Sequence, residues 1–204
     1  MENKVISVET LALNLEKHGY VVQVLEKGEN VGCVIKKYIS KEDIIGNGGS
    51  VTVESLGVYE KLHKDGYDVL CMREGITRDE SIEIGKQATV FITSTNAISE
   101  AGEFVNIDGR GNRVSQMAYG ASKIFYIFGE NKITKDLASA IDRVRNVASP
   151  LNARRLNKKT PCTVDLKCHD CTSPDRICKA MLISNRPTSA QTAHVIIIKD
   201  SLGY

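Results

Sequence analysis

Residues 123–129 read KIFYIFG, and the five residues between the terminal lysine and glycine are all large and apolar. A strand with one face in water would alternate apolar and polar side chains, whereas this run is apolar on both faces. Strands of this kind lie in parallel sheets that helices cover on both sides. The stretch therefore predicts a buried strand in an α/β sheet.

Strands and helices are predicted to alternate on either side of this run. Further strands are expected over residues 20–26, 43–45, 67–72, 89–93 and 194–200. Helices are expected over residues 8–18 (with Ser7 as N-cap and Gly19 as the stop), 30–38, 51–63, 78–86, 112–119 and 134–148 (with Thr134 as N-cap and Pro150 as the stop). Strands joined by such helices imply right-handed βαβ crossovers. The predicted fold is a three-layer α/β fold, with a mostly parallel sheet and helices on both faces.

Length and composition indicate one globular domain over residues 1–204. The chain has 204 residues, of which 42% are hydrophobic and 25% charged, close to the averages of globular proteins. Residues 151–192 are rich in Lys, Arg, Cys, Pro, Ser and Thr without a clear period. We interpret them as a Cys-rich appendage within the domain. The net charge of only +2 argues against a nucleic-acid partner.

The predicted location is cytoplasmic, without a membrane partner. The N-terminal sequence MENKVISVETL lacks the basic region and uninterrupted apolar stretch of a secretory signal. The longest apolar runs are the size of a strand, far short of the roughly 20 residues that cross a bilayer. In a reducing compartment, the six cysteines are expected to be thiols or metal ligands. Cys33 and Cys71 stand apart from the others and are predicted to be core residues.

The first polar loop, GNGGSVT at residues 46–52, follows a predicted strand and precedes a helix. Glycines allow a ligand close to the backbone, and free N–H groups at a helix start favour an anion. The loop has neither the phosphate-loop motif nor the dinucleotide pattern, so no nicotinamide cofactor is indicated. The alternative is a tight strand-to-helix turn with a serine cap. Its candidate ligand-binding residues are Gly46, Asn47, Gly48, Gly49, Ser50 and Thr52.

The second polar loop, TSTNAISEAGEFVNIDGRGNRV at residues 93–114, begins where the strand over 89–93 ends. Its middle alternates like a small hairpin, and its end turns into a helix whose start is crowded with polar side chains. An arginine beside a helix N-terminus is suited to a carboxylate or phosphate. Alternatively, the Asn and Asp side chains satisfy loop backbone and Arg113 pairs with an acid. The candidate ligand-binding residues are Thr93, Ser94, Thr95, Asn96, Asn106, Asp108, Arg110, Asn112 and Arg113.

The two loops are expected to line one pocket, because ligands of open α/β sheets bind at the carboxyl ends of the strands. Acid–base groups are sparse in these loops. Asp108 is the first catalytic candidate. Glu100 and Glu103 at the hairpin tip are weaker ones, which require the tip to fold over the pocket. The alternative for both glutamates is a solvated turn.

A second candidate site is the segment PCTVDLKCHDCTSPDRIC, which places Cys162, Cys168, Cys171 and Cys178 within 17 residues. Thiolates are ligands for iron–sulfur clusters and for zinc. The spacing matches neither a zinc ribbon nor the C-x2-C-x2-C-x3-C run of ferredoxins. An iron–sulfur cluster is the first expectation, structural zinc the second, and metal-free or redox-paired thiols the third. His169 is expected to be a neighbour that faces solvent.

The second loop, together with NKITKDLASAIDRVRNVASPLNARRL and the ending DSLGY, resembles the lactate-utilisation (LUD) domain family. The resemblance runs from the GNGGSVT loop to about Leu156. It implies a fold similar to sugar-phosphate isomerases and CoA transferases, with the same two loops lining a ligand cleft. It also implies a link to lactate oxidation, where iron–sulfur subunits work beside LUD subunits. Those partners carry the ferredoxin run, which this chain lacks.

Two functional hypotheses follow, and a third is weaker. In the first, the chain is an oxidoreductase component of small-carboxylate metabolism. It binds an anionic small molecule and transfers electrons through a cysteine-bound iron–sulfur cluster, with a redox protein as partner. In the second, it is a non-catalytic binding or regulatory module, in which zinc or free thiols stabilise the appendage. A CoA-ester or sugar-phosphate enzyme rests on fold analogy alone.

Overall fold

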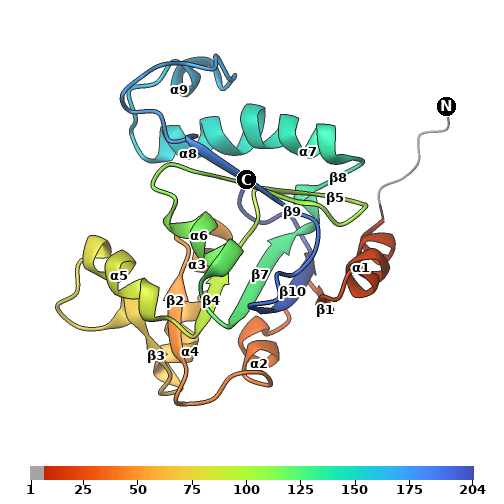
Figure 1. Cartoon of the computed structure of the whole chain (residues 1–204), viewed down its shortest axis with the longest axis vertical. Coiled ribbons are helices and arrows are strands. Elements are labelled where there is room, and N and C mark those ends of the chain that lie inside the picture. Colours follow the sequence, from red (N-terminus) through yellow and green to blue (C-terminus); the bar gives the residue numbers. More distant parts are fainter. Residues whose placement is uncertain (1–6) are drawn as a thin grey trace.

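The computed structural model describes residues 7–204, and for Arg78 it describes the backbone alone. Its main feature is a six-stranded sheet, which Figure 1 shows with helices packed around it. Most of the N-terminal stretch considered for a secretory signal, residues 1–6, lies outside the described residues. All pairings in the sheet are parallel. The strand order is β1 (Val21–Glu26), β10 (Thr192–Lys199), β7 (Lys123–Gly129), β4 (Val90–Thr93), β2 (Ile44–Asn47) and β3 (Asp68–Val69).

Strand β7 is buried on both faces, as its composition predicts. Ile124, Tyr126 and Phe128 belong to one hydrophobic cluster, while Phe125 and Ile127 belong to another. Apolar side chains of α1 and α6 join the first cluster, and those of α2, α3 and α4 join the second. The three-layer α/β prediction is confirmed. The helices are α1 (Val8–Lys17), α2 (Val31–Ile35), α3 (Val51–Ser55), α4 (Val58–Lys64), α5 (Arg78–Ile84), α6 (Asn112–Tyr119), α7 (Leu137–Arg143), α8 (Ser149–Arg155) and α9 (Cys162–Asp165).

A second, mixed sheet lies beside the first, and the sequence predicted only its hairpin. Its strand order is β8 (Ile133–Thr134), β5 (Ala97–Ser99), β6 (Phe104–Asp108) and β9 (Ala180–Ser184). The β5–β6 pair is antiparallel, as predicted. Strand β9 comes from the Cys-rich segment and pairs along the whole of β6. The segment predicted as an appendage therefore contributes a strand to this sheet.

Two predicted elements are interrupted in the structure. The helix predicted over residues 51–63 is divided at Gly57, whose φ of 60° is left-handed and ends α3 before α4 begins. The strand predicted over residues 67–72 is β3, two residues long, followed by a 3-10 turn over Leu70–Met72. Further 3-10 turns cover Gly85–Gln87 and Glu130–Lys132.

The helix predicted over residues 134–148 begins later and ends later than expected. Thr134 belongs to β8, and Asp136 is the N-cap of α7, accepting a hydrogen bond from the Ser139 amide at 2.7 Å. Pro150 does not end the helix. A π-helical turn over Val144–Ala148 leads into α8, and Pro150 occupies the first turn of α8. At that position its missing N–H removes no hydrogen bond that the new helical turn requires.

Cys33 was predicted to be a core residue, and the structure places it on the exposed side of α2. The buried face of this short helix is formed by Val31, Gly32, Val34 and Ile35. Cys71 is partly buried and packs against the second of the two hydrophobic clusters.

In the part of the chain that the structure describes, no helix is long and apolar enough to span a bilayer.

Candidate functional site

A cavity of about 470 Å³ opens where strands β2 and β4 end, and both polar loops line it. This volume is within the range of small-molecule sites. Three predicted residues, Gly46, Thr93 and Asn106, do not line the cavity. The predicted residues that do are Asn47, Gly48, Gly49, Ser50, Thr52, Ser94, Thr95, Asn96, Asp108, Arg110, Asn112 and Arg113.

The glycine loop lies close against strand β4. The Gly48 amide donates to the Ile92 carbonyl at 3.1 Å, which extends the pairing of β2 and β4 beyond the strand ends. Ser50 is the N-cap of α3, and its hydroxyl accepts from the Val53 amide at 3.3 Å. The serine cap of the alternative interpretation is thus present, on a loop that also lines the cavity.

Asn96 connects the beginning of the second loop to Ile107 and Arg113 near its end. The side-chain oxygen of Asn96 accepts from the Ile107 amide at 2.9 Å and from the Arg113 guanidinium at 2.9 Å. The guanidinium also donates to the Ile107 carbonyl at 2.6 Å. Among the described residues, no carboxylate forms an ion pair with Arg113. Burial lowers its pKa, and nearby Asp108 acts in the opposite direction.

Asp108 holds the start of helix α6. Its carboxylate accepts hydrogen bonds from the amides of Gly109, Arg113 and Val114, at 2.7, 2.8 and 3.3 Å. This carboxylate lines the cavity, but three backbone donors already occupy it. The observed contacts are those of a helix cap, and the catalytic role of Asp108 stays a prediction.

Glu100 and Glu103 lie away from the cavity, because the hairpin tip packs against α1. The side chain of Glu100 accepts from the Ser7 amide at 3.0 Å, and its carbonyl accepts from the Asn14 side chain at 2.8 Å. Glu103 accepts from the Ser99 hydroxyl at 2.6 Å. The tip does not fold over the pocket, which was the condition for a catalytic role.

Lys132 lines the cavity and was not singled out from the sequence. It is 3% exposed, and its ammonium donates to the Thr52 hydroxyl, the Ser94 hydroxyl and the Thr95 carbonyl at 2.9, 3.0 and 3.2 Å. Burial, with Arg143 and Arg113 nearby, lowers its pKa to about 7. The sequence did contain a signal for Lys132. The turn over Glu130–Lys132 follows the end of the predicted strand β7, so it lies at the same edge of the sheet as the two loops.

The cavity lining is strongly basic, although the net charge of the chain is only +2. The described lining contains three acids. Asp79 forms an ion pair with Arg110, and Asp108 accepts hydrogen bonds from amides at the start of α6. The third, Asp175, accepts from the Lys159 amide. The basic side chains of the lining are Arg110, Arg113, Lys132, Arg155, Lys158, Arg176 and Lys179.

The Cys-rich segment forms the outer wall of the cavity. Residues 174–177 and Lys179 line it, and the Lys179 amide donates to the Asp108 carbonyl at 2.9 Å. Gly109 lets the segment approach, since a Cβ there would lie 3.0 Å from the Ile177 carbonyl oxygen. Tyr204 adds to the wall, and its hydroxyl accepts from Arg155 at 2.8 Å.

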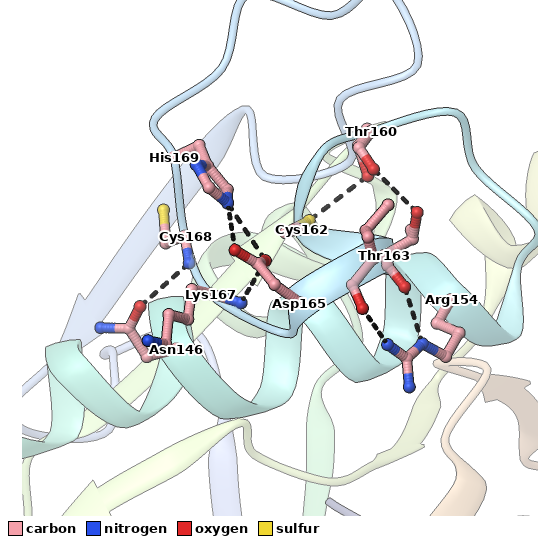
Figure 2. Close-up of polar contacts among 10 residues, drawn as sticks. Asn146, Arg154, Thr160, Cys162, Thr163, Asp165, Lys167, Cys168 and His169 are labelled. Atoms are coloured by element: carbon pink, nitrogen blue, oxygen red, sulfur yellow. Dashed lines mark hydrogen bonds and ion pairs between the residues drawn. The ribbon is translucent and has the colours of Figure 1, made fainter.

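The four predicted metal ligands are free thiols. Figure 2 shows Cys162 on α9 beside the Thr160 hydroxyl, and Cys168 on the following loop, where its amide donates to Asn146. His169 pairs with Asp165 at 2.9 Å. Within residues 7–204, no three His, Cys, Asp or Glu side chains are grouped so that they could hold a metal ion. The prediction that these cysteines bind an iron–sulfur cluster or a zinc ion stays a prediction.

A smaller cavity of about 160 Å³ adjoins the basic one. Cys168 and Cys178 line it, and Ser149 and Arg176 line both cavities. Burial raises the pKa of the Cys178 thiol; Arg176 lowers it, and the nearby Cys168 and Cys171 thiols raise it. The Cys168 and Cys171 thiols thus lie near the Cys178 thiol.

Comparisons with known proteins agree with this fold. The model of the LUD domain family matches residues 8–198. The chain is similar to the crystal structure of a DUF162 family protein from Deinococcus radiodurans, with a TM-score of 0.54 and 12% identity, over 93% of this chain and 94% of that chain. None of the curated proteins compared with the chain matches it. The resemblance seen in the sequence is confirmed: the chain belongs to the LUD domain family.

Proposed function

We propose that this protein acts in small-carboxylate metabolism by binding an organic anion in the basic cavity. The observation that carries the proposal is the pair of cations on the cavity wall, Arg113 and Lys132. Both lose solvation to the surrounding protein, and among the described residues no carboxylate forms an ion pair with either. A carboxylate ligand would supply the missing negative charge.

The cost of desolvating these cations supports the proposal. Removing a charge from water costs several kcal/mol per ion unless an opposite charge or hydrogen bonds compensate it. Here Arg113 and Lys132 have only neutral oxygens as hydrogen-bond acceptors. An anion between them would recover Coulomb energy in surroundings poorer in water than bulk solvent.

The position of the cavity also supports a ligand site. Strands β2, β4 and β7 all contribute loops to it, at the edge where open α/β sheets bind ligands. Membership of the LUD family, which is linked to lactate utilisation, favours a small carboxylate over other anions.

Arg113→Ala tests this proposal. We expect the variant to bind oxalate or pyruvate more weakly by roughly 1.5–3 kcal/mol, because a charged hydrogen bond to the ligand is lost. Titration calorimetry measures the affinity, and circular dichroism checks the fold. Arg73→Ala is the matched control, since Arg73 pairs with Asp68 outside the cavity lining. Equal affinities of a folded Arg113→Ala protein and the wild type would contradict the proposal.

Electron transfer through a cysteine-bound cluster is the second candidate. The Cys168 and Cys171 thiols lie near enough to Cys178 to raise its pKa, and this proximity favours the second candidate. The anion-binding proposal is independent of a cluster, because none of the four cysteines lines the larger cavity.

Metal content tests this second candidate. If it holds, protein purified without oxygen will be brown and contain stoichiometric iron, and Cys168→Ser or Cys171→Ser will lose that iron. Elemental analysis and visible absorbance provide the measurement. Cys33→Ser is the control, since this thiol is exposed on α2, away from the segment. A colourless protein that carries zinc would instead assign the cysteines a structural role.

A further inference from the structure

The Lys132 amine donates to three oxygens, the Thr52 and Ser94 hydroxyls and the Thr95 carbonyl. The Thr52 hydroxyl gives its own proton to the Leu202 carbonyl at 3.3 Å, and the Ser94 hydroxyl gives its proton to the Thr95 carbonyl at 3.4 Å. Both hydroxyl oxygens are therefore acceptors toward Lys132, as is the Thr95 carbonyl. Three acceptors match the three donors of an ammonium group.

The charges around Lys132 oppose this ammonium. Arg113 reaches toward it from α6 and Arg143 from α7, and both lower its pKa, although burial is the larger cause. Asp108 lies beside Arg113, and its carboxylate is bound to the amides at the start of α6. From the C-terminal tail, Tyr204 is the titratable group that lines the cavity. The hydrogen bonds thus favour a protonated Lys132, whereas burial and the two neighbouring arginines favour the neutral amine.

An anionic ligand beside Lys132 would resolve this conflict. We propose that the ligand is a dianion, a dicarboxylate or a phosphoryl-type group, and that it binds together with one proton taken up by Lys132. The proposal rests on anion binding in the basic cavity and extends it to the charge of the ligand and to its proton linkage. In the binding step, a neutral amine, a proton and a dianion combine to give an ammonium paired with the ligand, and no bond of the ligand breaks.

A dianion fits better than lactate because two cations, Lys132 and Arg113, share this wall and neither forms an ion pair with a carboxylate of the described residues. Asp108, the acid beside Arg113, is already bound to three backbone amides. One monocarboxylate would leave one of them uncompensated. The proton is assigned to Lys132 because the described lining of the larger cavity contains neither histidine nor cysteine. With a pKa of about 7, Lys132 is only partly charged near neutral pH until the ligand arrives.

Calorimetry with oxalate and with sulfate tests the proposal. Both remain dianions from about pH 6 to about pH 9, so any proton uptake in that range belongs to the protein. We expect both to bind at least tenfold more tightly than lactate at equal ionic strength. The affinity is expected to fall by up to about tenfold per pH unit above about pH 7, where the free amine is neutral. Heats measured in buffers of different ionisation enthalpy are expected to show uptake approaching one proton at the upper pH.

Two variants assign the proton. Lys132→Arg keeps the positive charge at all these pH values, so we expect binding without proton uptake and without the pH dependence. Lys132→Met removes the charge and is expected to weaken oxalate binding at least tenfold at about pH 6, where the wild-type lysine is charged. A proton uptake that persists in a folded Lys132→Arg protein would overturn the assignment.

The outcomes separate this inference from the proposed function. Anions that bind with no proton uptake, or lactate that binds as tightly as oxalate, would overturn the inference and leave anion binding intact. An absence of binding by oxalate, sulfate, pyruvate and lactate at every pH would overturn both.

Discussion

Phe104→Ala is expected to lower the free energy of unfolding by about 3–5 kcal/mol, the cost of truncating a buried aromatic side chain. The Phe104 side chain is fully buried in the layer between the two sheets. Its ring centroid lies 5.3 Å from that of Tyr20, 4.5 Å from Tyr126 and 6.1 Å from Phe128. Alanine would remove these ring contacts and leave a void between β6 and the central strand β7.

Urea unfolding followed by circular dichroism measures the effect. Tyr119→Ala is the control, because Tyr119 is 83% exposed and its removal is expected to change the stability by less than about 0.5 kcal/mol. A loss below about 1 kcal/mol in Phe104→Ala would mean that the second sheet is not an integral part of the core.

The main sheet was predictable because its signals are local. In β7 every side chain from Ile124 to Phe128 is apolar, and this run alone requires cover on both faces. Helix α1 has its serine cap and its glycine stop in the sequence, and the structure uses both. The second sheet had no comparable signal. Strands β8 and β9 pair with residues far away in the chain, and β8 is only two residues long.

The long helix shows how a local rule can fail. Pro150 was expected to end it, because proline lacks an N–H and disrupts an α-helix from within. The π-helical turn before it changes the hydrogen-bond pattern, and Pro150 then starts a new α-helical segment. Such turns have no clear sequence signature, so the extension to Arg155 could not be predicted.

The strand-end rule predicted that the two loops line one cavity, but two features of that cavity lay outside the prediction. The rule placed the loops after β2 and β4 together because the carboxyl ends of parallel strands meet at one edge. It was not applied to β7, so Lys132 was missed. Composition indicated a Cys-rich appendage over residues 151–192, but it could not indicate that pairing between β9 and β6 brings Arg176 and Lys179 of this segment to the cavity.

Gly48→Ala is expected to weaken anion binding by about 100-fold, the scale on which a displacement of about 1 Å affects a positioned site. A Cβ at Gly48 would lie 2.4 Å from the Thr93 hydroxyl and 2.9 Å from the Thr93 Cβ, distances shorter than van der Waals contact. Thr93 is fully buried and cannot yield, so the glycine loop must move. The same Cβ would lie 3.4 Å from the Arg113 Cδ, so a shift of the loop also changes the packing around this side chain.

Gly48→Ala is also expected to lower the free energy of unfolding by about 1–3 kcal/mol, because the added methyl group crowds a packed position. Gly85→Ala is the matched control. A Cβ at Gly85 meets nothing within 4 Å, and its φ of −57° suits any residue. That variant is expected to keep full affinity for oxalate and to be as stable as the wild type or slightly more stable. If Gly48→Ala bound oxalate as tightly as Gly85→Ala, the close approach of the glycine loop to Thr93 and Arg113 would have no part in forming the anion site.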